Sequence, residues 1–334
     1  MSEQTCYSVC IIGAGLAGLA AAQTLLDGGV RDVIVLDKGR SVGGRFATRR
    51  VDDGRADHGA QFMSARLPLF YEKCIEPGLQ NGALRVWFVD KSEKYVAVNG
   101  MNEWLKQWAK QIGDTYRLFT DVKVERVEED EAEWRIVTES GMIVRAKALV
   151  VTAPLPQTLA LTAPLQKTWN EADLQRLNEV AYDPCLALLL SLNGASSIES
   201  PGYCRTDLPE PISWIADNAQ KGISNQTVIT VHLRGDWSEA HYDDSDEAII
   251  ATIMPSLAPY CGGQDVSQVQ VKRWRYALSK QLYPAPCYVA NTSAPLLLAG
   301  DGFSCEPHHP PEEQGRAETA YLSGVAAARH LLGG

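Results

Sequence analysis

Apolar side chains in the first forty residues follow two different spacings. Residues 9–12 and 33–36 are unbroken apolar runs of the kind found in buried strands. From Leu16 to Leu26, in contrast, apolar positions recur every three or four residues, as on one face of a helix. The pattern therefore predicts a strand, a helix and a second strand within residues 8–38.

The turn between the first predicted strand and the helix carries a G-x-G-x-x-G arrangement of Gly13, Gly15 and Gly18. Gly13 permits a tight turn, Gly15 leaves room for a pyrophosphate, and Gly18 lets the helix and the strand pack closely. The helix N-terminus attracts phosphate through its free N–H groups and its dipole. Asp37 follows Gly18 by 19 residues, near the spacing of about 20 at which an acid binds a ribose. An acid there disfavours a 2′-phosphate, so FAD or NAD fits better than NADP.

The rest of the chain continues with the same two spacings. A hairpin is predicted over residues 84–89 and 94–98, followed by a helix to Ile112 with Asn102 as its N-cap. A three-strand meander then leads into a buried strand that stops at Pro154. The remaining predicted segments are the meander at 122–127, 133–138 and 142–145; its buried strand at 148–154; strands at 185–192, 227–233 and 269–274; a helix at 245–257; and a closing strand and helix at 295–299 and 316–332.

Three loops carry candidate site residues. Residues 43–45, Gly-Gly-Arg, form an electropositive turn whose backbone could approach a second phosphate. The small residues within 57–62 would let the chain pass beneath a flat ring, although a turn with a capping Asp57 explains them equally well. Gly300 and Asp301 end the last predicted strand, and the helix that follows would direct its N-terminus at whatever Asp301 holds.

Composition narrows the classes of partner. The 334 residues carry a net charge of −10, which argues against a nucleic acid or an anionic membrane surface as partner. The eight cysteines form no C-x-x-C pair, and no Cys/His group has zinc spacing, so we expect reduced cysteines and no metal. No apolar stretch reaches transmembrane length, and residues 1–8 contain Glu3 but no basic residue, unlike a signal peptide. A cytoplasmic location is the expectation.

These features together resemble the flavin-containing amine oxidase superfamily, and within it the renalase-like proteins. The superfamily's markers occur in order: the glycine fingerprint at 13–18, Asp37, the double-glycine loop at 43–45, Val-Thr-Ala-Pro at 151–154, and Gly300-Asp301. The renalase-like segments are 57–62, 214–218, 272–276 and 321–324. The chain departs from the family pattern at Ser41 and within residues 316–320, which leaves local cofactor geometry less well defined than FAD binding.

The resemblance implies an α/β fold, a glutathione-reductase-type Rossmann domain that binds FAD, with an inserted α+β substrate domain built on an antiparallel sheet. The boundaries that we expect are 1–75, 98–160 and 280–334 for the FAD-binding domain, and 76–97 and 161–279 for the substrate domain.

The resemblance also implies which residues contact the cofactor. Asp37 would bind the adenosine ribose, Val124 would contact adenine through its backbone, and Asp301 would bind the ribityl chain. The helix from about residue 316 would point at the flavin N1–C2=O edge, where its dipole favours the reduced state. The expected cofactor-binding residues are Gly13, Gly15, Ala17, Gly18, Asp37, Lys38, Gly44, Arg45, Gly59, Ala60, Gln61, Phe62, Val124, Ala153, Gly300, Asp301 and Ala317.

The implied reaction is hydride transfer from a small substrate to flavin N5, followed by reduction of O2 to hydrogen peroxide. Renalase-like enzymes resembling this chain oxidise dihydronicotinamide dinucleotides reduced at the 2- or 6-position. Such chemistry requires orientation more than acid–base groups. We expect Gln61, Trp214, Arg273 and Trp274 to orient the substrate, and Lys272, Arg273 and Arg275 to provide a basic group for its phosphates.

Two other functions remain open at this stage. An amine oxidase or a dehydrogenase for another substrate would use the same fold, with an aromatic cage and often a lysine near N5. A non-catalytic escort or scaffold protein would lack half of the cofactor site, whereas this chain retains both residues 43–45 and Gly300-Asp301.

Overall fold

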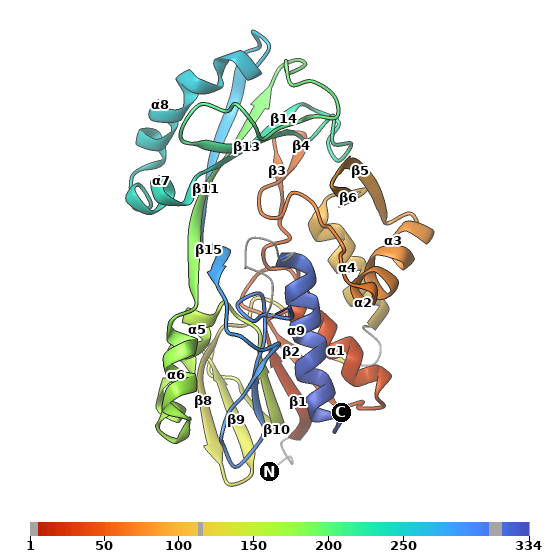
Figure 1. The fold of residues 1–334 in the computed structure, drawn as a ribbon, viewed down its shortest axis with the longest axis vertical. Helices are drawn as coiled ribbons and strands as arrows, with labels where there is room; N and C mark the ends of the chain where they lie inside the picture. The colour runs from red at the N-terminus through yellow and green to blue at the C-terminus, as the bar shows by residue number, and fades with distance from the viewer. Residues whose placement is uncertain (1–5, 113–115, 307–315, 334) are drawn as a thin grey trace.

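The fold was analysed in a computed structural model that describes residues 6–112, 116–306 and 316–333. Figure 1 shows two bodies, one above the other, joined by two long strands, β11 (Ala181–Leu192) and β15 (Val266–Gln281). This arrangement of a Rossmann-type body and a second body with an antiparallel sheet confirms the predicted fold class.

The first body is organised around a mostly parallel sheet whose strand order is β16-β17-β10-β1-β2-β7. The apolar run of residues 9–12 lies in β1, which pairs in parallel with β2 on one side and β10 on the other. The meander strands β8 and β9 extend the sheet from β10. The strands are β1 (Cys6–Ile12), β2 (Val33–Leu36), β7 (Arg117–Phe119), β8 (Val124–Asp130), β9 (Glu133–Thr138), β10 (Ile143–Val151), β16 (Tyr288–Val289) and β17 (Leu296–Leu298).

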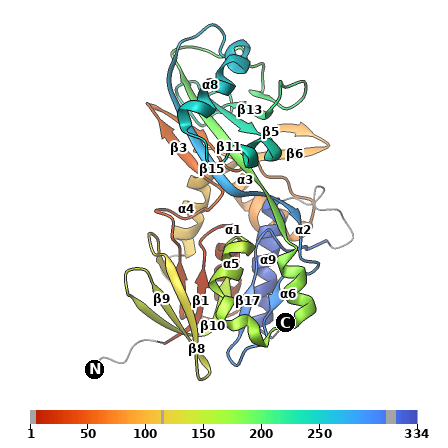
Figure 2. The ribbon, with the colours of Figure 1, turned by 90° about the vertical axis from the view of Figure 1, so that its left-hand side faces the viewer.

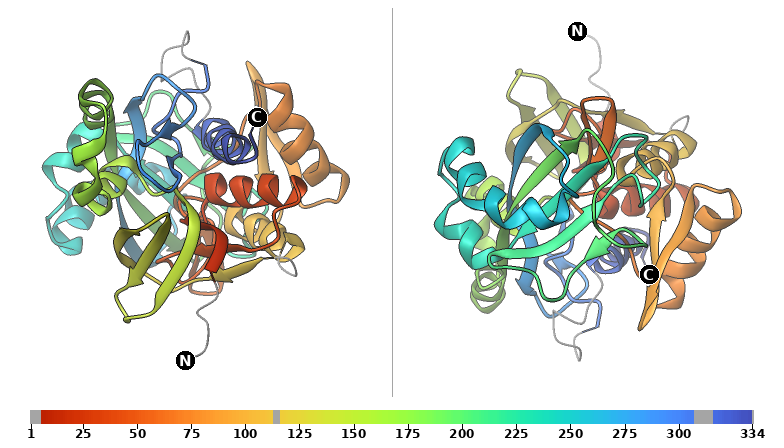
Figure 3. Two further views of the ribbon diagram at one scale, coloured as in Figure 1. Left: turned by 90° about the horizontal axis from the view of Figure 1, so that it is seen from below. Right: turned by 90° about the horizontal axis from the view of Figure 1, so that it is seen from above.

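Both faces of this sheet are covered, which explains why its central strands are apolar throughout. The helices α1 (Leu16–Asp27) and α9 (Arg316–Leu331) pack side by side on one face, as Figure 3 shows from below. Figure 2 shows β8 and β9 with α5 (Leu155–Leu161) and α6 (Glu171–Asn178) in the same lower body. Trp134 of β9 and Leu155 of α5 share a buried cluster with alternate residues of β1 and β10.

The second body holds an antiparallel sheet in the order β12-β13-β14-β11-β15. One face is apolar and packs against α8 (Asp246–Leu257), whose N-cap Ser245 accepts a hydrogen bond from the Ala248 N–H. The other face meets the hairpin of β3 (Thr48–Val51) and β4 (Gly54–Asp57). The remaining elements here are β12 (Tyr203–Cys204), β13 (Ile212–Asp217), β14 (Val228–Leu233) and α7 (Gly235–Ala240).

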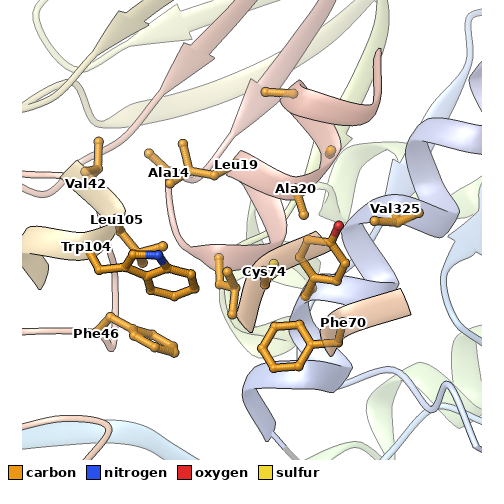
Figure 4. Packing of buried hydrophobic residues seen from close by; sticks show 14 of the residues in the cluster. Ala14, Leu19, Ala20, Val42, Phe46, Phe70, Cys74, Trp104, Leu105 and Val325 are labelled. Carbon is orange, nitrogen blue, oxygen red and sulfur yellow. The ribbon is translucent and has the colours of Figure 1, made fainter. Parts of the chain in front are cut away.

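A third group of elements lies beside α1 and α9. The predicted hairpin is present as β5 (Leu84–Asp90) and β6 (Ser92–Ala97). Short helices α2 (Pro68–Phe70) and α3 (Glu76–Gln80) precede it, and α4 (Met101–Ile112) follows it. Figure 4 shows side chains of four helices meeting in the core: Leu19 and Ala20 of α1, Phe70 of α2, Trp104 and Leu105 of α4, and Val325 of α9.

Three details differ from the predictions. The third meander strand and the buried strand after it are one continuous strand, β10. Asn102 is not an N-cap, because α4 begins one residue earlier and the Met101 N–H donates to the Asp57 carboxylate. Asp57, considered as the cap of a turn in its own loop, instead accepts the first N–H of α4 from a position 44 residues earlier in the chain.

The packing also bears on the proposed domain boundaries. Helices α5 and α6, beyond residue 154, pack on the first sheet, since Leu155 and Leu177 are buried in its core. The β3–β4 hairpin, in contrast, packs on the second sheet through Val51 and Ala56. The division into two domains remains a proposal, and this packing favours moving residues 161–180 to the first body.

Candidate functional site

The glycine fingerprint lies where β1 ends and α1 begins. A Cβ on Gly13 would lie 2.4 Å from Thr152 Oγ1, and one on Gly18 would lie 1.8 Å from the Gly13 carbonyl oxygen. A Cβ on Gly15 would meet no atom of the described residues within 4 Å. Gly13 and Gly18 are therefore required by packing, whereas the space at Gly15 is open toward a ligand, as pyrophosphate binding requires.

The double-glycine loop, residues 43–45, contacts the turn of the glycine fingerprint, residues 13–18. The Gly43 N–H donates to the Ala14 carbonyl (2.9 Å), and Gly44 approaches the Cα of Gly15. Asn102 fixes this loop, because its Nδ2 donates to the Val42 and Phe46 carbonyls. This role could not be predicted from the sequence, since the interaction spans about sixty residues of chain.

Arg45 and Asp301, predicted as separate cofactor contacts, form a bidentate ion pair. Arg45 donates to both carboxylate oxygens of Asp301 and to the Tyr276 carbonyl. The Asp301 side chain is buried, whereas that of Arg45 retains 28% of its exposure. The pair lies at the carboxyl end of β17, close to Gly300, whose N–H donates to Ser323 Oγ of α9 (2.8 Å).

The residues predicted for the adenosine end also come together. Asp37 accepts hydrogen bonds from the Ala14 and Gly39 N–H groups, both at 2.6 Å. The segment that leads into Val124 runs alongside, because the Val122 N–H donates to the Asp37 carbonyl. Lys38 extends to Gln157 of α5 (2.9 Å).

Two further predicted contacts lie at the ends of elements of the first body. Ala153 follows β10 beside Gly13, and Ala317 is in the first turn of α9. Ala17 is buried where α1 crosses α9, since a Cβ on Gly324 would lie 2.0 Å from its carbonyl oxygen. All these cofactor assignments remain predictions, which the arrangement at one edge of the sheet supports.

The loop of residues 57–62 is anchored by Asp57. Its carboxylate accepts from the hydroxyl of Thr48 and from Lys221 Nζ (2.8 Å), and both charged side chains are fully buried. Burial lowers the pKa of Lys221, and Asp57 opposes this shift. The loop crosses the Arg45 backbone so closely that a Cβ on Gly59 would lie 1.9 Å from the Arg45 carbonyl oxygen. The Ala60 N–H donates to that same oxygen (2.9 Å).

Three buried polar atoms near this loop have no hydrogen-bond partner among the described residues: His58 Nδ1, Gln61 Oε1 and Trp214 Nε1. The other end of the Gln61 amide is occupied, because Nε2 donates to the Asp57 and Gly59 carbonyls and lies 3.5 Å from His232 Nε2. His232 lies directly opposite Trp214 in the β13–β14 pair. Because buried polar atoms are almost always satisfied, this group indicates a ligand site.

The histidines of this group are neutral at physiological pH. Burial lowers the pKa of His58 to about 4, helped by the nearby Lys272. Burial likewise lowers the pKa of His232 to about 4. The site therefore presents uncharged donors and acceptors.

Five aromatic side chains form what we call the aromatic wall: Phe62, Trp87, Phe88, Tyr203 and Trp214. The Tyr203 and Trp214 rings are stacked, with centroids 5.1 Å apart and planes 7° apart, and Phe62 lies 5.6 Å from Trp214. Two lysines face the wall: Lys94 Nζ is 5.9 Å from the Phe62 centroid and Lys221 Nζ 4.9 Å from that of Trp87. Of the wall residues, only Phe62 and Trp214 were predicted as site residues.

Trp274 lies beside the loop of residues 57–62, and its role in orienting the substrate stays a prediction, whereas Arg273 lies elsewhere. Trp274 stacks on His58 (5.2 Å between centroids) and donates its indole N–H to the His58 carbonyl. Arg273 points to the opposite face of β15, where it pairs with Asp246 and donates to the Tyr242 and Asp244 carbonyls. The prediction that Arg273 orients the substrate is therefore wrong, because alternate residues of a strand face opposite sides.

The described residues also form a cleft of about 440 Å³, away from this site, between α1, α3, α4 and α9. Trp104, Trp108 and Tyr321 contribute to its lining. Among the described residues no three acidic, cysteine or histidine side chains are placed to hold a metal ion. None of the described helices is both long enough and apolar enough to cross a membrane.

Similarities to known proteins cover almost the whole chain. Residues 11–71 match the NAD(P)-binding Rossmann-like domain, and residues 82–332 match the flavin containing amine oxidoreductases. Mouse renalase is 24% identical over 326 residues, spanning 89% of this chain and 93% of renalase. A protein of Drosophila lebanonensis named anon-37Cs is 42% identical over 59 residues, 18% of this chain and 11% of its own length.

Solved structures share the fold. A variant of putrescine oxidase with redesigned cofactor binding superposes with a TM-score of 0.67 at 12% identity, over 99% of this chain and 100% of the oxidase chain.

Proposed function

The chain belongs to the flavin-containing amine oxidoreductase family and is an FAD-dependent oxidoreductase, and from this premise we propose that its substrate is a dihydronicotinamide dinucleotide reduced at the 2- or 6-position. The bound FAD would supply the hydride acceptor at N5, with O2 as the oxidant that regenerates it and hydrogen peroxide as the product.

The observation that carries the proposal is the group of unpartnered atoms beside the aromatic wall. Gln61 Oε1 accepts hydrogen bonds and Trp214 Nε1 donates them, and neither has a partner among the described residues. A primary carboxamide offers one donor group and one acceptor, which complements this pair. The nicotinamide ring carries such a carboxamide and is flat and neutral, so that it also suits the rings of Trp214 and Phe62.

The chain's own residues would bind and orient the two reactants. Gly15, the N-terminus of α1 and residues 43–45 would support the pyrophosphate of FAD, and the Arg45–Asp301 pair would lie near its ribityl chain. The loop of residues 57–62 is held rigidly by the Asp57–Lys221 pair. Hydride transfer needs no proton acceptor on the protein, which agrees with two histidines that are weak bases because their pKa is lowered to about 4.

An amine substrate is the second candidate, because the aromatic wall resembles a cage for a cation. The position of Lys94 argues against it. Lys94 already lies over the Phe62 ring, whereas the charge of Lys221, over the Trp87 ring, is balanced by Asp57. A protonated amine beside Phe62 would meet the like charge of Lys94, so a neutral substrate is favoured.

The test is anaerobic reduction of the FAD-loaded enzyme, with the loss of flavin absorbance measured over time. The 2- and 6-dihydro isomers of NADH should bleach the flavin at least about a hundredfold faster than ordinary 4-dihydro-NADH or simple amines, because misplacing the reacting carbon by about 1 Å costs roughly that factor. Peroxide should form in equal amount on addition of air.

Bleaching by a primary or secondary amine at a comparable or higher rate would replace the proposal with amine oxidation. The Gln61→Leu variant supplies the control: it nearly keeps the size of the side chain but removes the unpartnered oxygen, together with the Nε2 donor to the Asp57 and Gly59 carbonyls, so its FAD content and thermal stability are measured alongside. It should slow bleaching by the dihydronicotinamides and leave any slow reaction with amines unchanged.

A further inference from the structure

One row of side chains crosses the second sheet on the face that meets residues 57–62. Lys272 of β15 lies opposite Ala187 of β11, Ala187 opposite His232 of β14, and His232 opposite Trp214 of β13. Residues directly opposite one another in an antiparallel sheet point to the same face. Lys272 therefore belongs to the same surface as the unpartnered Trp214 indole, with only the small Ala187 between it and His232.

A second cation faces Lys272 from the β3–β4 hairpin. The hairpin lies against β11 and is held to β15 by a hydrogen bond from Ser267 Oγ to Asp52 Oδ2 (2.8 Å). Arg49 of this hairpin is close enough to contribute, after burial, to the lowered pKa of Lys272. Both cations also contribute to the lowered pKa of His58, so they converge on one place beside the His58–Trp274 stack.

Neither cation is neutralised by an acid. Within the described part of the chain, no carboxylate lies within ion-pair distance of Arg49 or Lys272. Asp246, the acid whose charge reaches Lys272, is itself paired with Arg273. Arg275 on the same far face is paired with Glu239 and lies over the Tyr242 ring at 3.5 Å. Strand β15 thus carries Arg273 and Arg275, each paired with an acid, on one face and Lys272, without an acid at ion-pair distance among the described residues, on the other.

We propose that Arg49 and Lys272 form an anion-binding subsite that holds the pyrophosphate of a dinucleotide substrate. This rests on the proposed function, because the subsite adjoins the surface that would receive the dihydronicotinamide ring. Lys272 is half-buried and Arg49 is exposed beside it, and a pyrophosphate between them would relieve their mutual repulsion and accept charge-assisted hydrogen bonds. The net charge of −10 repels dinucleotides at long range, so a local cation pair is needed to retain one.

The experiment compares two substrates of the FAD-loaded enzyme that differ in the adenosine diphosphate group: 6-dihydro-NADH, which carries the pyrophosphate, and the 6-dihydro isomer of nicotinamide riboside, which has no phosphate. The variants are Arg49→Gln, Lys272→Met and the double variant. KM for the dinucleotide should rise about tenfold in each single variant, and further in the double variant, because each removes a charged contact. KM for the riboside and kcat for both substrates should change less than twofold. Raising the salt concentration should increase only the dinucleotide's KM in the wild-type enzyme.

Arg50→Gln is the matched control, since Arg50 neighbours Arg49 on β3 but points to the other side of the hairpin, and it should change neither KM. A direct readout independent of turnover is calorimetric binding of ADP-ribose to the FAD-saturated enzyme, which should weaken about tenfold in each single variant. Equal losses for both substrates, unchanged dinucleotide KM, or absence of ADP-ribose binding by the wild-type enzyme would each overturn the subsite. If ADP-ribose binds as expected but no dihydronicotinamide bleaches the flavin, the subsite stands and the proposed substrate does not.

Discussion

Two glycines of the fingerprint serve different purposes, although the sequence motif treats them alike. Gly15 has an ordinary negative φ of −77° and open space beside it, whereas Gly18 touches the backbone of Gly13. A methyl group at Gly15 would therefore occupy only the space assigned to the pyrophosphate, and one at Gly18 would force α1 away from the turn.

The Gly15→Ala variant should fold normally and lose FAD affinity by at least tenfold, since the cofactor must give up close backbone contacts. The Gly18→Ala variant should be destabilised by about 1–3 kcal/mol even without cofactor, as expected for overpacking. FAD titration and thermal denaturation of the apoprotein separate the two effects. Equal loss of apoprotein stability in both variants would contradict the assignment of Gly15.

At this scale the sequence predicts residues whose role depends on their immediate neighbours, and misses those that act across the fold. The spacing of Gly13, Gly18 and Asp37 was sufficient because turn, helix and acid are contiguous in the chain. Asn102 and Lys221 could not be found, since their partners lie 56 or more residues away in sequence. Arg273 was misassigned because a strand's outward direction depends on its register with β11.

Helices and strands were predictable wherever one face alone meets the core. The helix α8 and its cap Ser245 follow directly from the spacing of apolar residues and the capping preference of serine. The length of β10 could not be anticipated, because only pairing with β9 at one end and with β1 along its length makes it continuous.

The crossing of α1 and α9 gives a prediction about elements. Alanine is a better helix former than glycine by about 1 kcal/mol, so Gly324→Ala would stabilise an isolated α9. In the fold the new Cβ would lie 2.0 Å from the Ala17 carbonyl oxygen, and the helices would have to separate. We expect a net loss of about 1–3 kcal/mol and weaker FAD binding. Ala326→Ser, at a half-buried position of the same helix, should change neither quantity; a gain in stability for Gly324→Ala would contradict this account.

For the whole molecule, the fold class could be predicted because the fingerprint and the later glycine motifs recur at the ends of strands that share one sheet. The boundaries between the two bodies could not be predicted, because some segments pack on a body other than the one their sequence position suggests. The early β3–β4 hairpin packs on the second sheet, and the later helices α5 and α6 pack on the first. The site forms where these bodies meet, so its unpartnered atoms come from segments far apart in the chain.

Two buried histidines of this site make the stability of the whole protein depend on pH. His58 and His232 have pKa values of about 4 in the folded protein and about 6.5 when unfolded. Between these values the unfolded chain binds more protons, so acid favours unfolding, and stability is lost as pH falls from 6.5 toward 4. At pH 5 each histidine should reduce the free energy of unfolding by about 2 kcal/mol relative to pH 7.

Urea denaturation at pH 7 and pH 5 measures this loss. The His232→Gln variant should lose about 2 kcal/mol less than the wild-type protein between the two pH values. His330→Gln, at an exposed position of α9, should behave as the wild type. An identical pH dependence for His232→Gln would show that His232 is not the titrating group.

The contact between α9 and α1 has a consequence for how the protein is made. During synthesis the ribosome releases the fingerprint first, but β10 and β17 must join β1 before the sheet is complete. Helix α9, which packs against α1 at Ala17 and receives the Gly300 N–H, emerges last of the structured elements. Nascent chains should therefore expose an unfinished nucleotide site until α9 has left the ribosome tunnel, and cofactor loading should wait for this helix.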